Sequence, residues 1–230
     1  MTTQTIPQPR TEFRNAARCQ ESLLAGLEKK CLLWLAQRMP AWVNSDHLTL
    51  LGFAAMFLAG VCYALAGEWP VLLLVVNLWL AVNWFGDSLD GTLARVRNQQ
   101  RPRYGFYVDH MVDSFSALFL VSGLAFSGYM DGWVALALLV SFYLLSINTY
   151  LATYTLGTFQ LSFWKFSPTE MRILLAVGNG VALVRPTVYI FGPPLRFFDV
   201  AGVIAVASMV LVLIVSVTRN TLELYRAEKI

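Results

Sequence analysis

Four aspartates lie close together between two long apolar segments of this 230-residue sequence, at Asp87, Asp90, Asp109 and Asp113. A charge inside a lipid bilayer costs about 2.5–3.5 kcal/mol on insertion scales, so an ionisable residue at such a position usually has a function. Four carboxylates in a medium of low dielectric repel one another unless cations neutralise them. Oxygen ligands suit hard divalent cations, and two ions of Mg²⁺ or Mn²⁺ would supply four positive charges.

The apolar segments on either side predict two membrane helices that carry the aspartates. Residues three or four apart share one face of a helix. Two stripes follow from this spacing: Asn83, Asp87, Asp90 and Ala94 on the first helix, and Gly105, Asp109 and Asp113 on the second. The segment between Arg95 and Gly105 is polar and basic. We therefore expect the two helices to be antiparallel neighbours whose acidic stripes face each other.

The composition indicates a membrane protein. Hydrophobic residues make up 57% of the chain and charged residues 13%, whereas a soluble domain carries about 25% charged residues. The first 20 residues are polar and do not resemble a signal peptide. Cys19, Cys31 and Cys62 have neither disulfide nor zinc spacing. We expect membrane lipids around the protein and no nucleic-acid partner.

Three regions are expected along the chain. Residues 1–19 are polar and predict a mobile arm. Residues 20–39 predict an amphipathic helix at the membrane interface, which Pro40 ends. Residues 40–230 predict an all-α domain of six transmembrane helices, each near the roughly 20 residues needed to span. The predicted spans are 47–67, 70–95, 105–128, 132–156, 169–190 and 197–218.

The distribution of basic residues predicts the orientation. Of the 17 Lys and Arg residues, all but Arg185 and Arg196 fall on the side of the two termini. Cytoplasmic loops carry the excess of Lys and Arg. We therefore expect both termini in the cytoplasm, and the aspartates at the cytoplasmic ends of the second and third spans, where nucleotides are available. The expected location is the plasma membrane of a prokaryote.

The residues from Asp87 to Asp113 resemble the signature of a known family. They read Asp-x2-Asp-Gly-x2-Ala-Arg, nine residues, then Gly-x3-Asp-x3-Asp. This is similar to the motif of the CDP-alcohol phosphotransferases at all eight fixed positions. The resemblance implies a transferase that moves a substituted phosphate from a CDP-linked donor to an alcohol and releases CMP. It also implies a homodimer.

The resemblance assigns roles to the four aspartates. Asp87, Asp90 and Asp109 would bind one metal ion, and Asp87, Asp109 and Asp113 the second. Asp113 would also be the general base, the catalytic residue that takes the proton of the attacking hydroxyl.

Further residues are expected to bind substrate. Gly91 and Gly105 would let the nucleotide approach the backbone, Ala94 keeps that face shallow, and Arg95 would meet phosphate. The other candidates are Asp46, Thr49, Asn83, Arg101, Lys165 and Arg172.

Several of these candidates have alternatives. The family often has Pro-Asn-x-Leu-Thr where this chain has Ser45-Asp46-His47-Leu48-Thr49; Thr49 fits and Asp46 departs, so Asp46 is either a substrate contact or a helix N-cap. Asn83 either orients a carboxylate or base, or makes an interhelical hydrogen bond. Lys165 and Arg172 either bind an anionic acceptor or anchor the interface.

The sequence leaves the substrate pair open. CDP-diacylglycerol with a small, charged alcohol is favoured, because Lys165 and Arg172 suit a charged acceptor. Transfer of choline or ethanolamine phosphate to diacylglycerol is the alternative. An intramembrane prenyltransferase would need its second acidic pair much further along the chain. A transporter would show repeats or interrupted helices, which this sequence lacks.

Overall fold

The computed structural model describes residues 17–19, 25–156, 158–160, 168–190 and 192–228. Its helices are α1 (Ala25–Arg38), α2 (Ser45–Leu65), α3 (Leu72–Val96), α4 (Pro102–Phe126), α5 (Gly132–Leu156), α6 (Pro168–Val184) and α7 (Phe197–Ala227). Its short strands are β1 (Ala17–Cys19), which runs parallel to β2 (Thr158–Gln160), and β3 (Thr187–Val188), which is antiparallel to β4 (Leu195–Arg196). The described part of the chain is therefore mostly helical, as predicted.

Five of these helices are long and apolar enough to cross a membrane: α2, α3, α4, α5 and α7. The predicted sixth span, 169–190, corresponds to α6, which ends at Val184 after 17 residues. Pro186 lacks a backbone N–H and disfavours helical geometry at Arg185, so the helix stops there. At ~1.5 Å per residue α6 is about 25 Å long, slightly less than the hydrocarbon thickness of a bilayer. The last span is longer than predicted, because α7 continues from 218 to Ala227.

The predicted N-terminal regions are described only in part. Residues 1–16 and 20–24 lie outside the described residues. The last three residues of the predicted arm form β1, which pairs with β2 just beyond α5. The predicted interfacial helix is present as α1, which ends two residues before Pro40.

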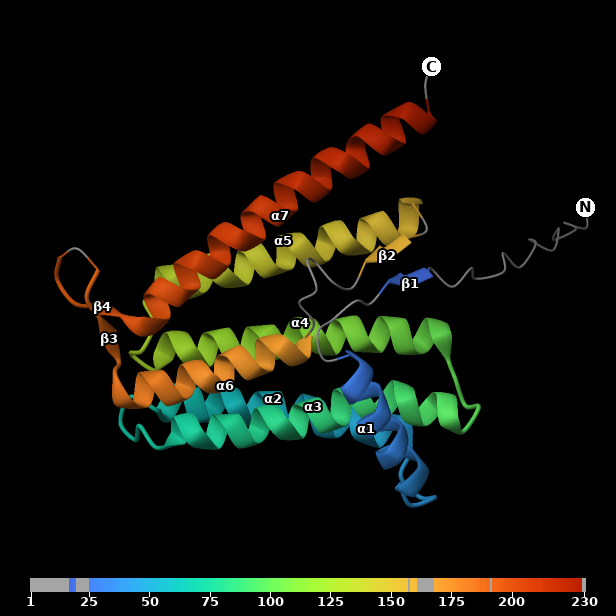
Figure 1. Ribbon diagram of the computed structural model, residues 1–230, viewed down its shortest axis with the longest axis horizontal. Helices are drawn as coiled ribbons and strands as arrows, with labels where there is room; N and C mark the ends of the chain where they lie inside the picture. The colour runs from blue at the N-terminus through green and yellow to red at the C-terminus, as the bar shows by residue number, and fades with distance from the viewer. Residues whose placement is uncertain (1–16, 20–24, 157, 161–167, 191, 229–230) are drawn as a thin grey trace, which may run out of the picture.

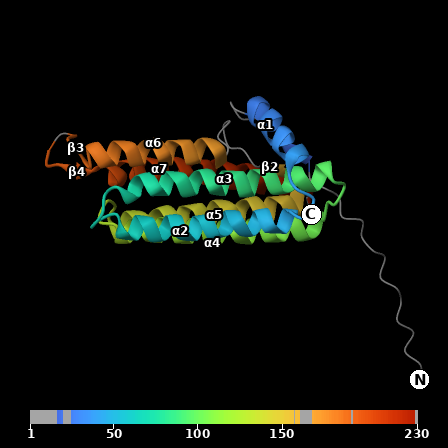
Figure 2. The ribbon, with the colours of Figure 1, turned by 90° about the horizontal axis from the view of Figure 1, so that it is seen from below.

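The helices run side by side in a bundle, with α1 lying across the end of α3 (Figures 1 and 2). α2 packs closely against both α3 and α4, and α6 packs on α3. α5 and α7 form a second pair, and α7 diverges from the other helices toward its C-terminal end (Figure 1). The start of α2, the end of α3 and the start of α4 meet at one end of the bundle, which we call the motif end.

Glycines allow α2 to approach its two neighbours closely. A Cβ added to Gly86 on α3 would lie 2.5 Å from the carbonyl oxygen of Leu48 and 2.7 Å from the backbone nitrogen of Gly52, both on α2. A Cβ on Gly123 of α4 would likewise collide with the backbone of Gly60. Small residues at crossings of this kind are typical of membrane helices. These close crossings fix the positions of α3 and α4 against α2.

A buried polar network joins three helices in the other half of the bundle. The Tyr63 hydroxyl donates to Asn179 Oδ1 at 2.7 Å, and Asn179 Nδ2 donates to Asn77 Oδ1 at 2.7 Å. Tyr63 and Asn179 are fully buried. The network therefore fixes α6 against α2 and α3.

Candidate active site

The structure brings the four aspartates toward one region at the motif end. Asp87 and Asp90 come from α3, and Asp109 and Asp113 from α4. Asp113 has electrostatic interactions with the other three carboxylates, and Asp90 has them with Asp87 and Asp109. The four carboxylates therefore lie near enough for their charges to interact.

The two helices that carry the aspartates are not direct neighbours in the way the sequence predicted. Among the described residues, α3 and α4 make little backbone contact with each other, and both pack on α2 instead. Four carboxylates on directly packed helices would be forced together without water or cations between them, which is costly at low dielectric.

Asp87 is held by an arginine from α6. Arg172 Nη2 donates to Asp87 Oδ2 at 2.5 Å, and Arg172 Nε donates to Asn83 Oδ1 at 2.7 Å. Asn83 in turn donates from Nδ2 to the carbonyl oxygen of Gly52 at 3.0 Å. Asn83 thus makes the interhelical hydrogen bond given above as its alternative, and it also orients the arginine that holds Asp87.

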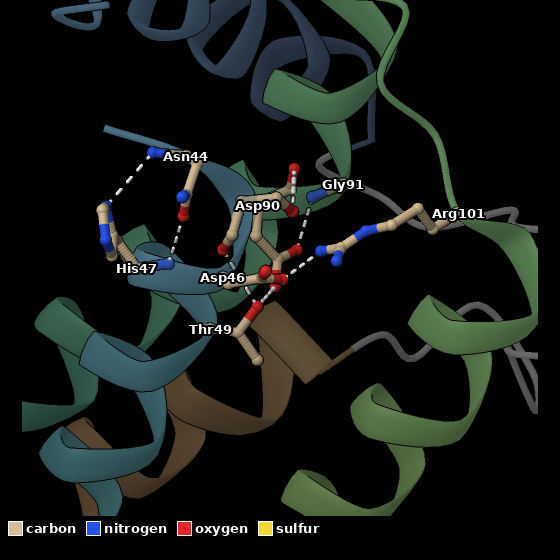
Figure 3. A network of polar contacts seen from close by, with 8 residues as sticks. Asn44, Asp46, His47, Thr49, Asp90, Gly91 and Arg101 are labelled. Atoms are coloured by element: carbon tan, nitrogen blue, oxygen red, sulfur yellow. Dashed lines mark hydrogen bonds and ion pairs between the residues drawn. The ribbon is translucent and has the colours of Figure 1, made fainter. Parts of the chain in front are cut away.

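Asp90 is held by the first turn of α2 (Figure 3). The Thr49 hydroxyl donates to Asp90 Oδ2 at 2.6 Å, and the Ser45 hydroxyl donates to the Asp90 carbonyl oxygen at 3.0 Å. The backbone N–H of Gly91 donates to Asp90 Oδ1. Thr49, predicted as a substrate-binding residue, therefore contacts a predicted metal ligand in this structure.

The interpretation of Asp46 as a helix N-cap is wrong. Asn44 caps α2: its Oδ1 accepts from the backbone N–H of His47 at 2.9 Å, and His47 Nδ1 accepts from the backbone N–H of Asn44 at 3.3 Å (Figure 3). Asp46 lies in the first turn, where a negative charge suits the helix dipole, and forms an ion pair with Arg101. Two residues predicted to bind substrate thus contact each other, with about half of each side chain exposed.

The remaining predicted substrate residues have these positions. Arg95 Nη2 donates to the Thr92 hydroxyl at 3.0 Å, and Ala94 is partly buried one residue before it. A Cβ on Gly105 would meet nothing within 4 Å, and one on Gly91 only Arg95 Nη1 at 3.6 Å. Neither glycine is therefore required by packing, and their role toward a nucleotide stays a prediction. Lys165 lies outside the described residues.

A connection from α1 to the site was not predicted from the sequence. Glu28 Oε1 accepts hydrogen bonds from Trp84 Nε1 at 2.8 Å and from the Thr169 hydroxyl at 2.7 Å. Trp84 follows Asn83 on α3, and Thr169 lies one turn before Arg172 on α6. The signal in the sequence was an indole N–H inside an apolar segment, which needs an acceptor when buried, but spacing cannot identify that acceptor.

Arg97 also has a structural role that its charge alone does not predict. It donates to the carbonyl oxygens of Met39, Pro40 and Val43, which belong to the connection between α1 and α2. From its charge, Arg97 was predicted only to lie on the cytoplasmic side. Its contacts fix the start of α2, and with it Thr49, against the end of α3.

The chemistry of the four aspartates fits a divalent cation, although their side chains are engaged with protein partners. Within the described ranges, no three His, Cys, Asp or Glu side chains are grouped so that they could hold a metal ion. Asp87 and Asp90 instead accept from Arg172 and Thr49. A hard cation prefers this all-oxygen donor set, and at Asp87 Oδ2 and Asp90 Oδ2 it would compete with the present partners.

Comparison with known proteins identifies the family. The profile of the CDP-alcohol phosphatidyltransferase family matches residues 42–218. The chain belongs to this family. The match includes α2 to α5, α6 and most of α7, so it covers every element that contributes an aspartate or one of the side chains holding Asp87 and Asp90.

Similar curated proteins come from animals and an archaeon. Cholinephosphotransferase 1 of Gallus gallus is 28% identical over 186 residues, covering 74% of this chain and 54% of the relative. That of Bos taurus is 27% identical over 188 residues, covering 74% and 45%. Archaetidylinositol phosphate synthase of Pyrococcus horikoshii is 28% identical over 106 residues, covering 46% and 53%. The chain thus spans about half the length of the curated relatives it matches.

A solved structure shares the fold. The phosphatidylinositol phosphate synthase of Mycobacterium tuberculosis, crystallised with CDP-DAG bound, aligns with a TM-score of 0.62 and 18% sequence identity. The alignment covers 83% of this chain and 94% of that protein. The chain therefore shares the fold of that synthase.

Proposed function

We propose that the protein is a CDP-alcohol phosphotransferase that makes a phospholipid. The observation that carries this proposal is the family motif, whose aspartates lie on α3 (Asp87, Asp90) and α4 (Asp109, Asp113) near enough for their charges to interact. The family match over residues 42–218 supports it. The donor is a CDP-linked lipid or alcohol, the acceptor is an alcohol, and CMP is the other product.

The reaction is one phosphoryl transfer. The acceptor oxygen forms a bond to the phosphorus that carries the donor's substituent, and the bond from that phosphorus to the bridging oxygen of the diphosphate breaks, so CMP leaves. The proton of the acceptor hydroxyl goes to Asp113, which lies on α4 near the other three carboxylates. The four aspartates would hold Mg²⁺ or Mn²⁺, and the bound cations would supply positive charge to the diphosphate oxygens.

We favour CDP-diacylglycerol as the donor and a small, charged alcohol as the acceptor. Arg172 supports this choice, because its guanidinium lies among the aspartates and a planar guanidinium suits phosphate oxygens. The fold neighbour crystallised with CDP-DAG is consistent with it. The second candidate is transfer of choline phosphate from CDP-choline to diacylglycerol, which the cholinephosphotransferases among the relatives favour.

The proposal includes three further features. The active site faces the cytoplasm of a prokaryotic cell, as the distribution of Lys and Arg predicts. Two ions of Mg²⁺ or Mn²⁺ bind at the aspartates. The protein is a homodimer, as the family resemblance implies.

The release of CMP tests the proposed function. Purified protein in detergent–lipid micelles is supplied with Mn²⁺ and either CDP-diacylglycerol plus candidate alcohols, or CDP-choline plus diacylglycerol. We expect CMP with one donor only, and no CMP after treatment with EDTA or in Asp87→Asn. Release of CMP at an unchanged rate in EDTA would contradict the metal role. No CMP from either donor with any acceptor would contradict the proposed function.

A further inference from the structure

Arg172 places a positive charge of the protein itself among the predicted metal ligands. It comes from α6, outside the motif, and its Nη2 donates to Asp87 Oδ2 at 2.5 Å. Arg172 also has a favourable electrostatic interaction with Asp113. Only 14% of the arginine side chain and 22% of the aspartate side chain are exposed, so water screens the pair weakly.

Several hydrogen bonds orient the Arg172 side chain toward Asp87. Asn83, which is 4% exposed, accepts from Arg172 Nε while its own amide is fixed on the Gly52 carbonyl oxygen. The start of α6 is tied to α1 through the hydrogen bond from Thr169 to Glu28. The position of the guanidinium is therefore set by three helices besides its own.

The guanidinium is nevertheless incompletely satisfied. Its Nη1 is buried and has no hydrogen-bond partner among the described residues. A buried donor of a charged group left in this state costs free energy. Arg172 therefore compensates Asp87 while one of its own donors has no acceptor among the described residues.

Arg172 and a divalent cation that both contacted Asp87 would repel each other. One arginine against four carboxylates leaves three negative charges, whereas two divalent cations neutralise all four, and Arg172 would then be in excess. A cation on Asp87 Oδ2 at an ordinary ligand distance of about 2.1 Å would also lie roughly 4 Å from Nη2, where like charges repel strongly.

We infer that Arg172 is a resident counter-ion of Asp87 that a divalent cation must displace, so that arginine and metal compete for one carboxylate. This inference rests on the proposed function, because it takes Asp87 to be a metal ligand. Competition lowers the apparent metal affinity by the fraction of protein in which Asp87 is still paired. Removing the arginine must then tighten metal binding, even though the same change weakens the metal-free fold.

Mn²⁺ binding to the full chain tests the inference. Free Mn²⁺ is titrated by electron paramagnetic resonance in wild type, Arg172→Gln, Arg172→Lys and Arg38→Gln. We expect Arg172→Gln to bind Mn²⁺ roughly tenfold tighter, because a charge-assisted hydrogen bond no longer competes. Arg172→Lys should tighten binding by less, since one ammonium cannot hold both Asn83 and Asp87. Arg38→Gln should leave binding unchanged, because it removes an equal charge from an exposed residue beside Trp34.

The outcomes separate this inference from the proposed function. If neither wild type nor Arg172→Gln binds Mn²⁺, the proposed metal-dependent function is wrong. If wild type binds Mn²⁺ and both Arg172 variants bind it equally or more weakly, Arg172 only supports the fold and its role as a displaced counter-ion is wrong. Thermal unfolding without metal shows whether each variant folds. If Arg172→Gln does not fold, the Mn²⁺ affinity of Arg172→Lys alone tests the inference.

Discussion

At the scale of single residues, the function of each aspartate depends on the neighbour it faces. Asp87 faces an arginine, Asp90 a threonine hydroxyl, and Asp113 is exposed between other carboxylates. The four share one residue type and one motif but have different surroundings. Among them, Asp113 is the carboxylate that we expect to receive the proton of the acceptor.

Replacement of Asp113 by Asn should abolish turnover and leave binding of the CDP substrate largely intact. The amide has nearly the same shape but cannot take up the proton, a change that typically costs about 10²–10⁴-fold in rate. CMP release measures the rate, and CDP-substrate binding is measured separately. Asp131→Asn, in the turn between α4 and α5, is the matched control and should be near wild type. CMP release at the normal rate in Asp113→Asn would show that another group is the base.

At the scale of helices, the site depends on how closely α2 can approach α3. Gly86 lies one residue before Asp87, and its Cα faces the backbone of Leu48 and Gly52. The same turn of α2 carries Thr49, which holds Asp90. The distance between these two backbones therefore determines whether the first turn of α2 can reach the motif.

Replacement of Gly86 by Ala should separate α2 from α3 and reduce both stability and activity. A methyl group at this position collides with backbone atoms that cannot rotate away, and such overpacking typically costs about 1–3 kcal/mol. Unfolding in detergent and CMP release measure the two effects. Gly180→Ala on α6 is the control, because an added Cβ meets nothing within 4 Å. Equal losses in the two variants would show that general helix effects, rather than the crossing, are responsible.

At the scale of the whole molecule, α6 links the motif end to the opposite half of the bundle. It carries Arg172 near its start and Asn179 two turns later, where Tyr63 and Asn77 hold it. The position of Arg172 beside Asp87 is therefore fixed partly by contacts far from the site, between residues distant in sequence.

Replacement of Tyr63 by Phe should destabilise the fold by about 1–3 kcal/mol, because buried Asn179 loses a donor that water cannot replace. Tyr143→Phe is the control: its hydroxyl donates at 3.0 Å to the carbonyl oxygen of Ser114, and its side chain is only partly buried. We expect a smaller loss there. Chemical unfolding in detergent compares the two. A larger loss from Tyr143→Phe would contradict the importance of the buried network.

The sequence by itself determined the helical membrane class, the positions of α2 to α5 to within a few residues, and the motif with its four aspartates. Apolar length, helical spacing and the types of the motif residues are local properties, so they can be read along the chain. Only the tertiary structure decided that α3 and α4 both pack on α2 and that Arg172 pairs with Asp87. These facts depend on which surfaces meet, and contacts between residues 85 or more positions apart leave no periodic trace in the sequence.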